Sequence, residues 1–383
     1  MCICAALFVS TGRVVALETD QFTVPDRPLA DIGPEMDLYV ASTVWDVAQK
    51  LSARATAEDR EAASDAFPFF GAYHRSLAAR YRGADLLAKR VYDVLAGPGL
   101  PECKIEQWVR THPFRAAGRD GAGQALFNLS LAQCVYGDSL FSKPPLLAYV
   151  SPTVNVHGAY VGVDKFGHLF QQGYDYYEEY RSARDDGDDE EHAAARAVRS
   201  GVGGERGIFG EALTGVYSNA DLAANYAGLK FYLNLTRPVR IGDAFLPPLL
   251  LRDAAGNWCF NPDRRPAGLL RPFVDEHLNE ALNPSRFEPV LRETVRENLR
   301  GRSERLLEFY GTTPQRERRR MEELATWHGE NYGHSDRGLV TIADDCRPSD
   351  EVGGRGVVTA GSKLPSSASP DHTRVSATRL STR

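Results

Sequence analysis

The segment that most constrains the fold of this chain runs from Thr214 to Leu235, because it has helical spacing but is apolar on almost every side. An α-helix turns 100° per residue, which places Asp221, Asn225 and Gly228 on one narrow stripe. A helix whose other faces are all apolar is expected to be buried all round. The chain must therefore build a large core around this segment, and the two polar side chains inside that core need partners. Gly228 allows another backbone or a ligand to approach the stripe closely.

A second polar stripe is predicted on the helix that begins at Asp164. The same rotation places four polar residues within about 60° of one another on this helix. These residues are Asp164, His168, Gln171 and Asp175. Aromatic residues and Gly173 fall on the opposite side. Because buried polar groups need partners, we expect the two helices to pack with their polar stripes facing each other.

The residue types on the two stripes suit acid–base or metal chemistry. Asp164 and His168 lie four residues apart, so they project from one helix face and can hold a divalent metal or form a carboxylate-oriented histidine. Such a histidine titrates near neutral pH and can act as a general base that activates water. Asp221 would be a second ligand or the orienting carboxylate, and Asn225 would donate to a developing oxyanion. The candidate catalytic residues are these four, and the candidate metal ligands are His168, Asp164 and Asp221.

Other residues of the two segments are candidate ligand-binding positions. They are polar or small and lie on or beside the stripes: Lys165, Gln171, Asp175, Ser218 and Gly228. Two residues outside the helices would complete the site. Glu211 lies in the loop before the second helix, and His157 lies on a predicted hairpin before the first.

The same residues also have a structural interpretation. Ser218 followed by Asp221 fits a capping box with Asp in place of Glu, and Asp221 would then complement the helix dipole. Asp164 would cap the first helix, Asn225 would tie neighbouring helices together, and His168 would be a satisfied core histidine. Two hypotheses therefore stand. One is a non-enzymatic protein with a structural or small-ligand network, and the other is a hydrolase that uses His168, with or without a metal.

The motifs on the two segments resemble those of a known group of proteins. The pattern D-K-x-x-H followed by S-x-x-D-x-x-x-N-x-x-G is similar to that of a bacterial family of predicted periplasmic or envelope-associated proteins, distantly similar to VanZ-like proteins. The matching residues are Asp164, Lys165, His168, Ser218, Asp221, Asn225 and Gly228. The resemblance covers residues 158–235 and implies association with the cell envelope, but no reaction. VanZ-like proteins are embedded in the membrane, and in this respect the chain departs from them.

Charge and hydropathy bound the partners and the location. The net charge of −6 and the isoelectric point of about 5.9 argue against a nucleic-acid-binding protein. The sequence contains no apolar run of 18 or more residues, so it predicts no transmembrane helix. Residues 2–9 are apolar, and Val14 and Ala16 fit a cleavage site before Leu17, so residues 1–16 are interpreted as a truncated signal peptide. We therefore expect a periplasmic or otherwise exported protein; the alternative is a short buried strand in a cytoplasmic one. The sequence does not indicate the oligomeric state.

Four cysteines remain if the leader is removed, namely Cys103, Cys134, Cys259 and Cys346. In an exported protein these four are candidates for disulfides, and three pairings are possible. A bridge between Cys103 and Cys134 is the preferred one, because the segment between them is short and rich in loops. The alternative is a set of buried free thiols.

The remaining pattern predicts a mainly α fold with a single irregular helical domain and one or two small β-hairpins. Residues 17–33 are predicted to be an extended arm, and residues 34–345 the helical core domain. The hairpins are expected around His157 and around Gly256, where turn residues separate short β-branched or apolar runs. Residues 346–383 are rich in Gly, Ser, Thr and Pro and are predicted to be disordered.

Overall fold

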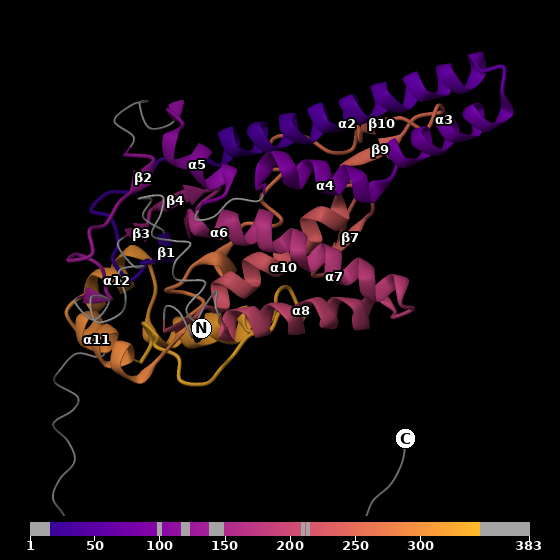
Figure 1. Cartoon of the computed structure of the whole chain (residues 1–383). Coiled ribbons are helices and arrows are strands. Elements are labelled where there is room, and N and C mark those ends of the chain that lie inside the picture. The colour runs from indigo at the N-terminus through magenta and orange to yellow at the C-terminus, as the bar shows by residue number, and fades with distance from the viewer. Residues whose placement is uncertain are drawn as a thin grey trace, which may run out of the picture. The chain divides into compact units, whose positions relative to one another are not determined.

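Helices dominate the architecture, and the small sheets lie among them (Figure 1). The computed structural model describes residues 16–97, 102–115, 123–137, 149–207, 211 and 215–344. The predicted signal peptide, apart from its last residue, lies outside these residues, as do Cys346 and the predicted disordered tail. No helix in this part of the chain is long and apolar enough to cross a membrane.

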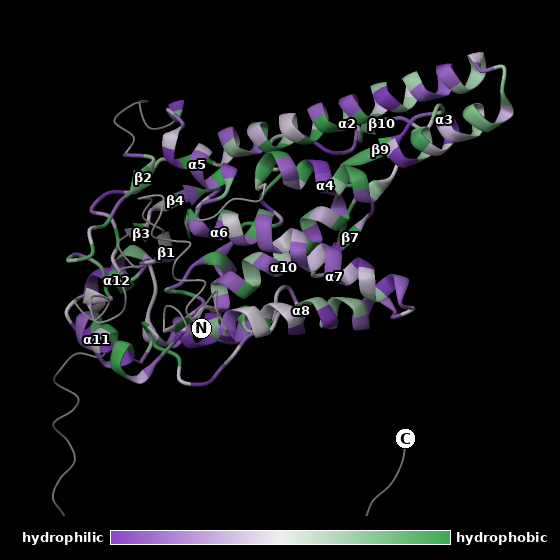
Figure 2. Cartoon of the chain, viewed as in Figure 1, coloured by the Kyte–Doolittle hydropathy of each residue, from purple (hydrophilic) through white to green (hydrophobic). Residues whose placement is uncertain are grey.

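The helices are numbered in the order in which they follow one another along the chain. They are α2 (Gly33–Ser64), α3 (Pro68–Tyr81), α4 (Ala84–Leu95), α5 (Lys104–Thr111), α6 (Asp164–Gly167), α7 (Gly173–Asp185), α8 (Glu190–Arg206), α10 (Asn219–Asn234), α11 (Pro289–Arg300), α12 (Ser303–Phe309) and α13 (Pro314–Leu324). A π-helical turn, η3 (His168–Gln172), joins α6 to α7, and η4 (Glu276–Leu278) is a short 3₁₀ helix. The long α2 and its partner α3 project as a helical hairpin, and both carry hydrophilic and hydrophobic residues along their length (Figures 1 and 2).

The strands are short and pair in five small sheets within the described residues. β1 (Ala16–Thr19) pairs in parallel with β3 (Tyr149–Ser151), and β2 (Leu126–Phe127), β4 (Thr153–Val156) and β5 (Ala159–Gly162) form a three-stranded sheet. The antiparallel pairs are β6 (Val216–Tyr217) with β11 (Arg286–Phe287), β7 (Val239–Ile241) with β8 (Ala244–Leu246), and β9 (Leu250–Arg252) with β10 (Trp258–Phe260).

Both predicted hairpins are present. The described residues form five small sheets, which is more β-structure than the one or two hairpins that the sequence indicated. The turn between β4 and β5 has positive φ at His157 and Gly158, the combination that a tight two-residue hairpin turn requires. The second hairpin, β9–β10, turns at Gly256, which also has a positive φ.

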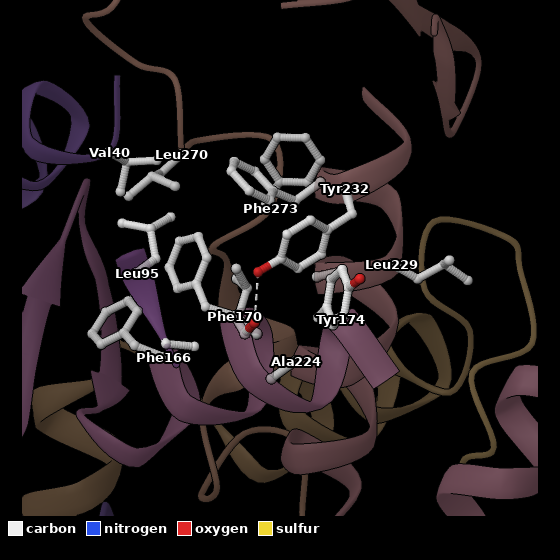
Figure 3. Packing of buried hydrophobic residues seen from close by; sticks show 14 of the residues in the cluster. Val40, Leu95, Phe166, Phe170, Tyr174, Ala224, Leu229, Tyr232, Leu270 and Phe273 are labelled. Atoms are coloured by element: carbon white, nitrogen blue, oxygen red, sulfur yellow. Dashed lines mark hydrogen bonds between the residues drawn. The ribbon is translucent and has the colours of Figure 1, made fainter. Parts of the chain in front are cut away.

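The core surrounds α10, as its sequence predicts. Every residue of α10 except Lys230 is buried. Phe170 from η3, Tyr232 from α10 and Phe273 pack together beside it, and the Tyr232 hydroxyl donates to the Phe170 carbonyl at 2.7 Å (Figure 3). The apolar residues of α2, including Val40, belong to the same cluster. The helix is thus held by contacts on all sides.

Two glycines set how closely α10 meets its neighbour. A Cβ added to Gly173 would lie 2.5 Å from the Gly228 Cα, and one added to Gly228 would collide with the Leu169 carbonyl oxygen. The sequence predicted that Gly173 lies opposite the Asp164 stripe and so faces away from the second helix. This prediction is wrong, because Gly173 packs against Gly228 of α10. The backbones of η3, α7 and α10 therefore touch directly.

The predicted extended arm is part of the core rather than a surface segment. It contains strand β1, and its apolar residues Phe22, Val24 and Leu29 are buried. The preferred disulfide is wrong. Cys103 and Cys134 are both free thiols in the structure, and they belong to two different hydrophobic clusters. Cys259 is also free.

Candidate functional site

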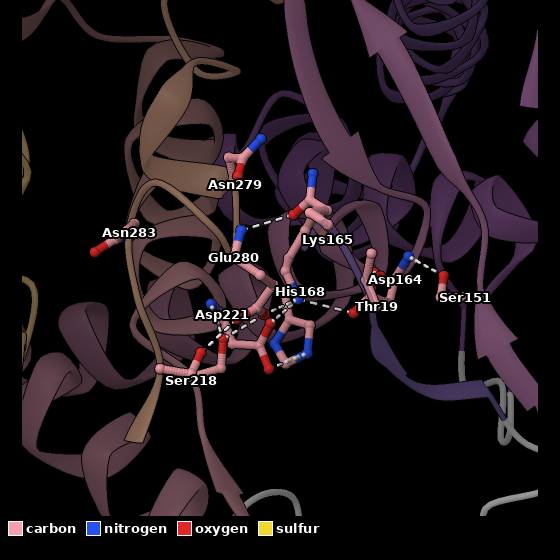
Figure 4. A network of polar contacts seen from close by, with 12 residues as sticks. Thr19, Ser151, Asp164, Lys165, His168, Ser218, Asp221, Asn279, Glu280 and Asn283 are labelled. Atoms are coloured by element: carbon pink, nitrogen blue, oxygen red, sulfur yellow. Dashed lines mark hydrogen bonds and ion pairs between the residues drawn. The ribbon is translucent and has the colours of Figure 1, made fainter. Parts of the chain in front are cut away.

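A buried lysine stands at the centre of the polar residues that the two stripes bring together. The side chain of Lys165 has no solvent exposure. Its ammonium contacts three carboxylates, at 2.8 Å from Asp164, 2.5 Å from Asp221 and 2.6 Å from Glu280 (Figure 4). We call these four residues, with His168 and Ser218, the Lys165 network.

The start of α6 positions Asp164 and Lys165. The chain enters α6 directly from β5, and the Ser151 hydroxyl of β3 accepts a hydrogen bond from the Asp164 backbone N–H at 3.0 Å. The Thr19 hydroxyl of β1 donates to the Asp164 carboxylate. The parallel pair β1–β3 thus orients the first carboxylate, while Lys165 points toward α10.

The N-terminus of α10 positions the other two carboxylates. The Ser218 hydroxyl accepts a hydrogen bond from the Asp221 N–H at 3.0 Å, which is the predicted N-cap, and donates to the Glu280 carboxylate at 2.7 Å. The second oxygen of Glu280 accepts from the Ser285 hydroxyl. The side chain of Asp221 is therefore free to reach Lys165 and His168 rather than close a capping box.

Both ring nitrogens of His168 are engaged. Its Nε2 lies 3.2 Å from the Asp221 carboxylate, and its Nδ1 lies 3.1 Å from the side-chain amide of Asn225. The hydrogen bonds around the Asn225 amide are best formed when its nitrogen faces His168. In that orientation the Asn225 nitrogen lies within donating distance of the His168 Nδ1 and of the backbone carbonyls of His168 and Asp221. In this arrangement Nδ1 accepts a hydrogen bond from Asn225, and Nε2 faces the Asp221 carboxylate. Each ring nitrogen of His168 thus has a partner within the protein.

Carboxyl groups outnumber the cations of the network. Glu18 and Glu205 are buried beside it, and the Ser218 N–H donates to Glu205 at 2.8 Å. Burial and the nearby carboxylates raise the pKa of Glu18 and of Glu205 well above the usual range. The raised pKa values favour the protonated form of both groups, which limits the negative charge inside the core.

The ionised members are stabilised by one another. Burial alone would lower the pKa of Lys165, but the carboxylates of Asp164, Asp221 and Glu280 raise it well above the usual range. Burial alone would likewise raise the pKa of Asp164, but Lys165 and the Thr19 hydroxyl hold it below the usual range. Lys165 is thus a permanent ammonium in the interior.

The predicted metal ligands do not fit a divalent cation in this structure. Asp164 and Asp221 both face the Lys165 ammonium, and the His168 Nε2 faces Asp221. Glu18, Asp221 and Glu280 also have carboxylate oxygens within 4.8 Å of one another. Two of these three already pair with Lys165, so a metal would lie beside a like charge.

The π-helical turn changes which residues reach the network. A π turn inserts one extra residue into a helix, and the stripe predicted at 100° per residue is displaced beyond it. Gln172, rather than Gln171, faces the Asn225 amide, at 3.2 Å. Asp175 lies on the exposed side of α7. The predicted place of Asp175 on the buried polar stripe is therefore wrong.

Two further candidates lie elsewhere. His157 is buried and pairs with Asp37, whose carboxylate lies 3.0 Å from its Nε2. Glu211 forms an ion pair with Arg286 at 2.5 Å. Neither residue completes the Lys165 network.

Sequence reasoning missed several members of the network and its surroundings. They lie outside the two helices: Glu18, Thr19, Glu205, Glu280 and Ser285. Glu280 offered one signal, since it is a lone carboxylate among Leu278, Ala281 and Leu282. The others have ordinary polar surroundings in the sequence.

A second polar cluster joins η4 to the turn after α13. The buried His277 contacts the Asp275 carboxylate at 2.9 Å through Nδ1 and the Thr326 carbonyl at 2.9 Å through Nε2. The His328 Nε2 lies 2.9 Å from the other Asp275 oxygen. Because both nitrogens of His277 face acceptors, the hydrogen bonds favour the protonated ring.

Comparison with known proteins gives no relative: no family model, no curated protein and no solved structure matches this chain.

Proposed function

We propose that this chain is a non-enzymatic cell-envelope protein in which the Lys165 network is a structural polar core. One observation carries the proposal: the ammonium of Lys165 is fully buried and bound by three carboxylates. The engagement of both His168 nitrogens supports it, because a general base needs a lone pair that a substrate can reach.

The network joins parts of the chain that lie far apart in the sequence. Asp164 ties α6 to β1 through Thr19, and Glu280 ties the segment after η4 to α10 through Ser218. A buried charge that loses its partner is strongly destabilising, so the network stabilises one arrangement of these elements over alternatives. Such a network serves specificity of packing more than total stability.

Association with the envelope rests on the sequence resemblance and on the apolar leader. Fractionation of the native host would test it. Recovery with the periplasmic or membrane fraction supports the proposal, and recovery with the cytosolic fraction contradicts it.

The structural role is tested by replacing Lys165 with an apolar residue of similar length. Lys165→Met leaves buried carboxylates without their cation and is expected to lower the free energy of unfolding by about 3–5 kcal/mol. Lys230→Met, on α10, is the matched control. Lys230 forms an ion pair with one carboxylate of the described residues, Glu330, and its side chain is partly exposed, so its loss is expected to cost about 1 kcal/mol. Equal effects of the two substitutions would contradict the proposal.

A hydrolase that uses His168 with Asp164 and Asp221 is the second candidate. The π turn that begins at His168 favours it, since π turns are frequent at functional sites, and the His168 side chain retains 13% exposure. Ester and phosphate-ester hydrolysis by the wild type and by His168→Gln distinguishes the two candidates. Activity that is lost in His168→Gln, with stability retained, would replace the structural proposal by the hydrolase.

A further inference from the structure

A pocket of about 300 Å³ opens beside the N-terminus of α10, outside the Lys165 network. Its walls come from the end of α8, from the paired strands β6 and β11, and from residues 333–337. This volume is at the lower end of the range found for small-molecule sites. The pocket is therefore large enough for a small ligand.

The pocket carries an excess of positive charge in a chain whose net charge is −6. Arg206, Arg286 and Arg337 line it, against one acidic lining residue, Asp336. Within the residues that the structure describes, neither Arg206 nor Arg337 has an ion-pair partner. Guanidinium groups without carboxylate partners on the wall of a pocket are available to an anionic ligand.

The third arginine is fixed in place. The guanidinium of Arg286 stacks on the Tyr217 ring, 4.7 Å from its centroid, and pairs with Glu211 at 2.5 Å. Its Nε is buried and has no hydrogen-bond partner among the residues that the structure describes. A buried donor without an acceptor is costly, and an acceptor oxygen supplied by a ligand or by water would satisfy it.

The opposite wall is preformed by hydrogen bonds. The Tyr217 hydroxyl donates to the Gly333 carbonyl at 3.1 Å. The side chain of Asn219 accepts from the Ser335 N–H at 2.9 Å and donates to the Ser335 carbonyl at 3.0 Å. Burial lowers the pKa of His334, so its imidazole is neutral at pH 7 and adds a hydrogen-bonding group rather than a charge. The site needs little rearrangement to accept a ligand.

We infer that this pocket binds a small phosphate-bearing ligand, held by Arg206, Arg286 and Arg337. Three guanidinium groups suit a phosphate better than a carboxylate, because a terminal phosphate has three oxygens and up to two negative charges. The inference does not depend on the role of the Lys165 network, since none of these arginines belongs to it.

The test uses the full chain and inorganic phosphate as the probe, with isothermal titration calorimetry at constant ionic strength. Arg206→Glu and Arg337→Glu reverse the two unpaired charges, both on exposed side chains that do not support the core. Arg319→Glu, an exposed arginine of α13 outside the pocket, is the control with the same change in net charge. We expect saturable binding that weakens about tenfold in each pocket variant and not in the control.

Three results would overturn the inference. They are no saturable binding of phosphate by the wild type, the same affinity in all four proteins, and an equal loss in Arg319→Glu. Acetate, titrated in parallel, separates the two anion classes. Tighter binding of acetate than of phosphate would assign the pocket to carboxylates and refute the phosphate proposal.

Discussion

The contact between Gly228 and the helix opposite predicts an unusual response to a single methyl group. In Gly228→Ala the new Cβ would lie 2.7 Å from the Gly173 Cα and would collide with the Leu169 carbonyl oxygen. Both are backbone atoms of a buried helix, so neither can rotate aside as a flexible side chain would. The two helices must separate, and the packing around them must open.

The expected size follows from two opposing effects. Alanine in place of glycine stabilises a helix interior by about 1 kcal/mol. Forcing an extra carbon into a tightly packed core costs about 1–3 kcal/mol, and the upper end applies here because backbone meets backbone. The net expectation is a loss of about 2 kcal/mol in the free energy of unfolding.

A chemically identical substitution provides the control. Gly203 lies in α8, and a Cβ added there meets nothing within 4 Å. Gly203→Ala should therefore keep the propensity gain and stabilise the protein by up to about 1 kcal/mol. Urea or guanidinium unfolding, monitored by circular dichroism, measures both. If Gly228→Ala proves as stable as Gly203→Ala, the close approach of these helices is not what packs the core.

Three further outcomes are expected. Lys165→Met should unfold at a much lower denaturant concentration at pH 7, and the loss should shrink as acid protonates the carboxylates around it. Ser218→Ala should cost about 1–2 kcal/mol in urea unfolding, since it removes an N-cap inside the core; a loss below a few tenths would contradict the capping role. Burial alone would lower the pKa of His277, but Asp275 and the Thr326 carbonyl raise it. Its stabilising contribution is therefore complete below a pH of about 6.5 and is lost as the pH rises through the raised pKa. His277→Gln should abolish this slope, and an unchanged slope in that variant would assign the pH dependence to other groups.

The helices that build the site were predictable where the helical period is regular. The apolar faces of α10 indicated burial on all sides, and the stripe with Asp221 and Asn225 indicated a polar partner. The structure supplies that partner in His168 and Lys165. Capping chemistry identified Ser218 because a hydroxyl three residues before a carboxylate has a local meaning.

The sequence was misleading where the period changes. The π turn at His168–Gln172 shifts every later side chain, so Gln172 takes the position predicted for Gln171. Nothing local in the sequence marks this turn, because it forms where tertiary contacts hold Gly173 against α10. Several strands were missed for a related reason. Two-residue strands such as β2 and β6 are too short to show an alternating pattern.

The carboxylates outside the two helices could not be predicted, because burial of a single acidic residue leaves no periodic trace. Glu18 and Glu205 resemble surface residues until the fold surrounds them. Their raised pKa is a property of the assembled core, where desolvation by burial is its largest cause.

The strand β1 has a consequence for how the chain is made. Thr19 finds its carboxylate 145 residues later in the sequence, and the Gln21 side chain accepts from the backbone of Glu280, 259 residues later. During synthesis, which proceeds from the N-terminus, these groups leave the ribosome long before their partners exist. The N-terminal strand must therefore wait without its native partners until most of the chain has emerged.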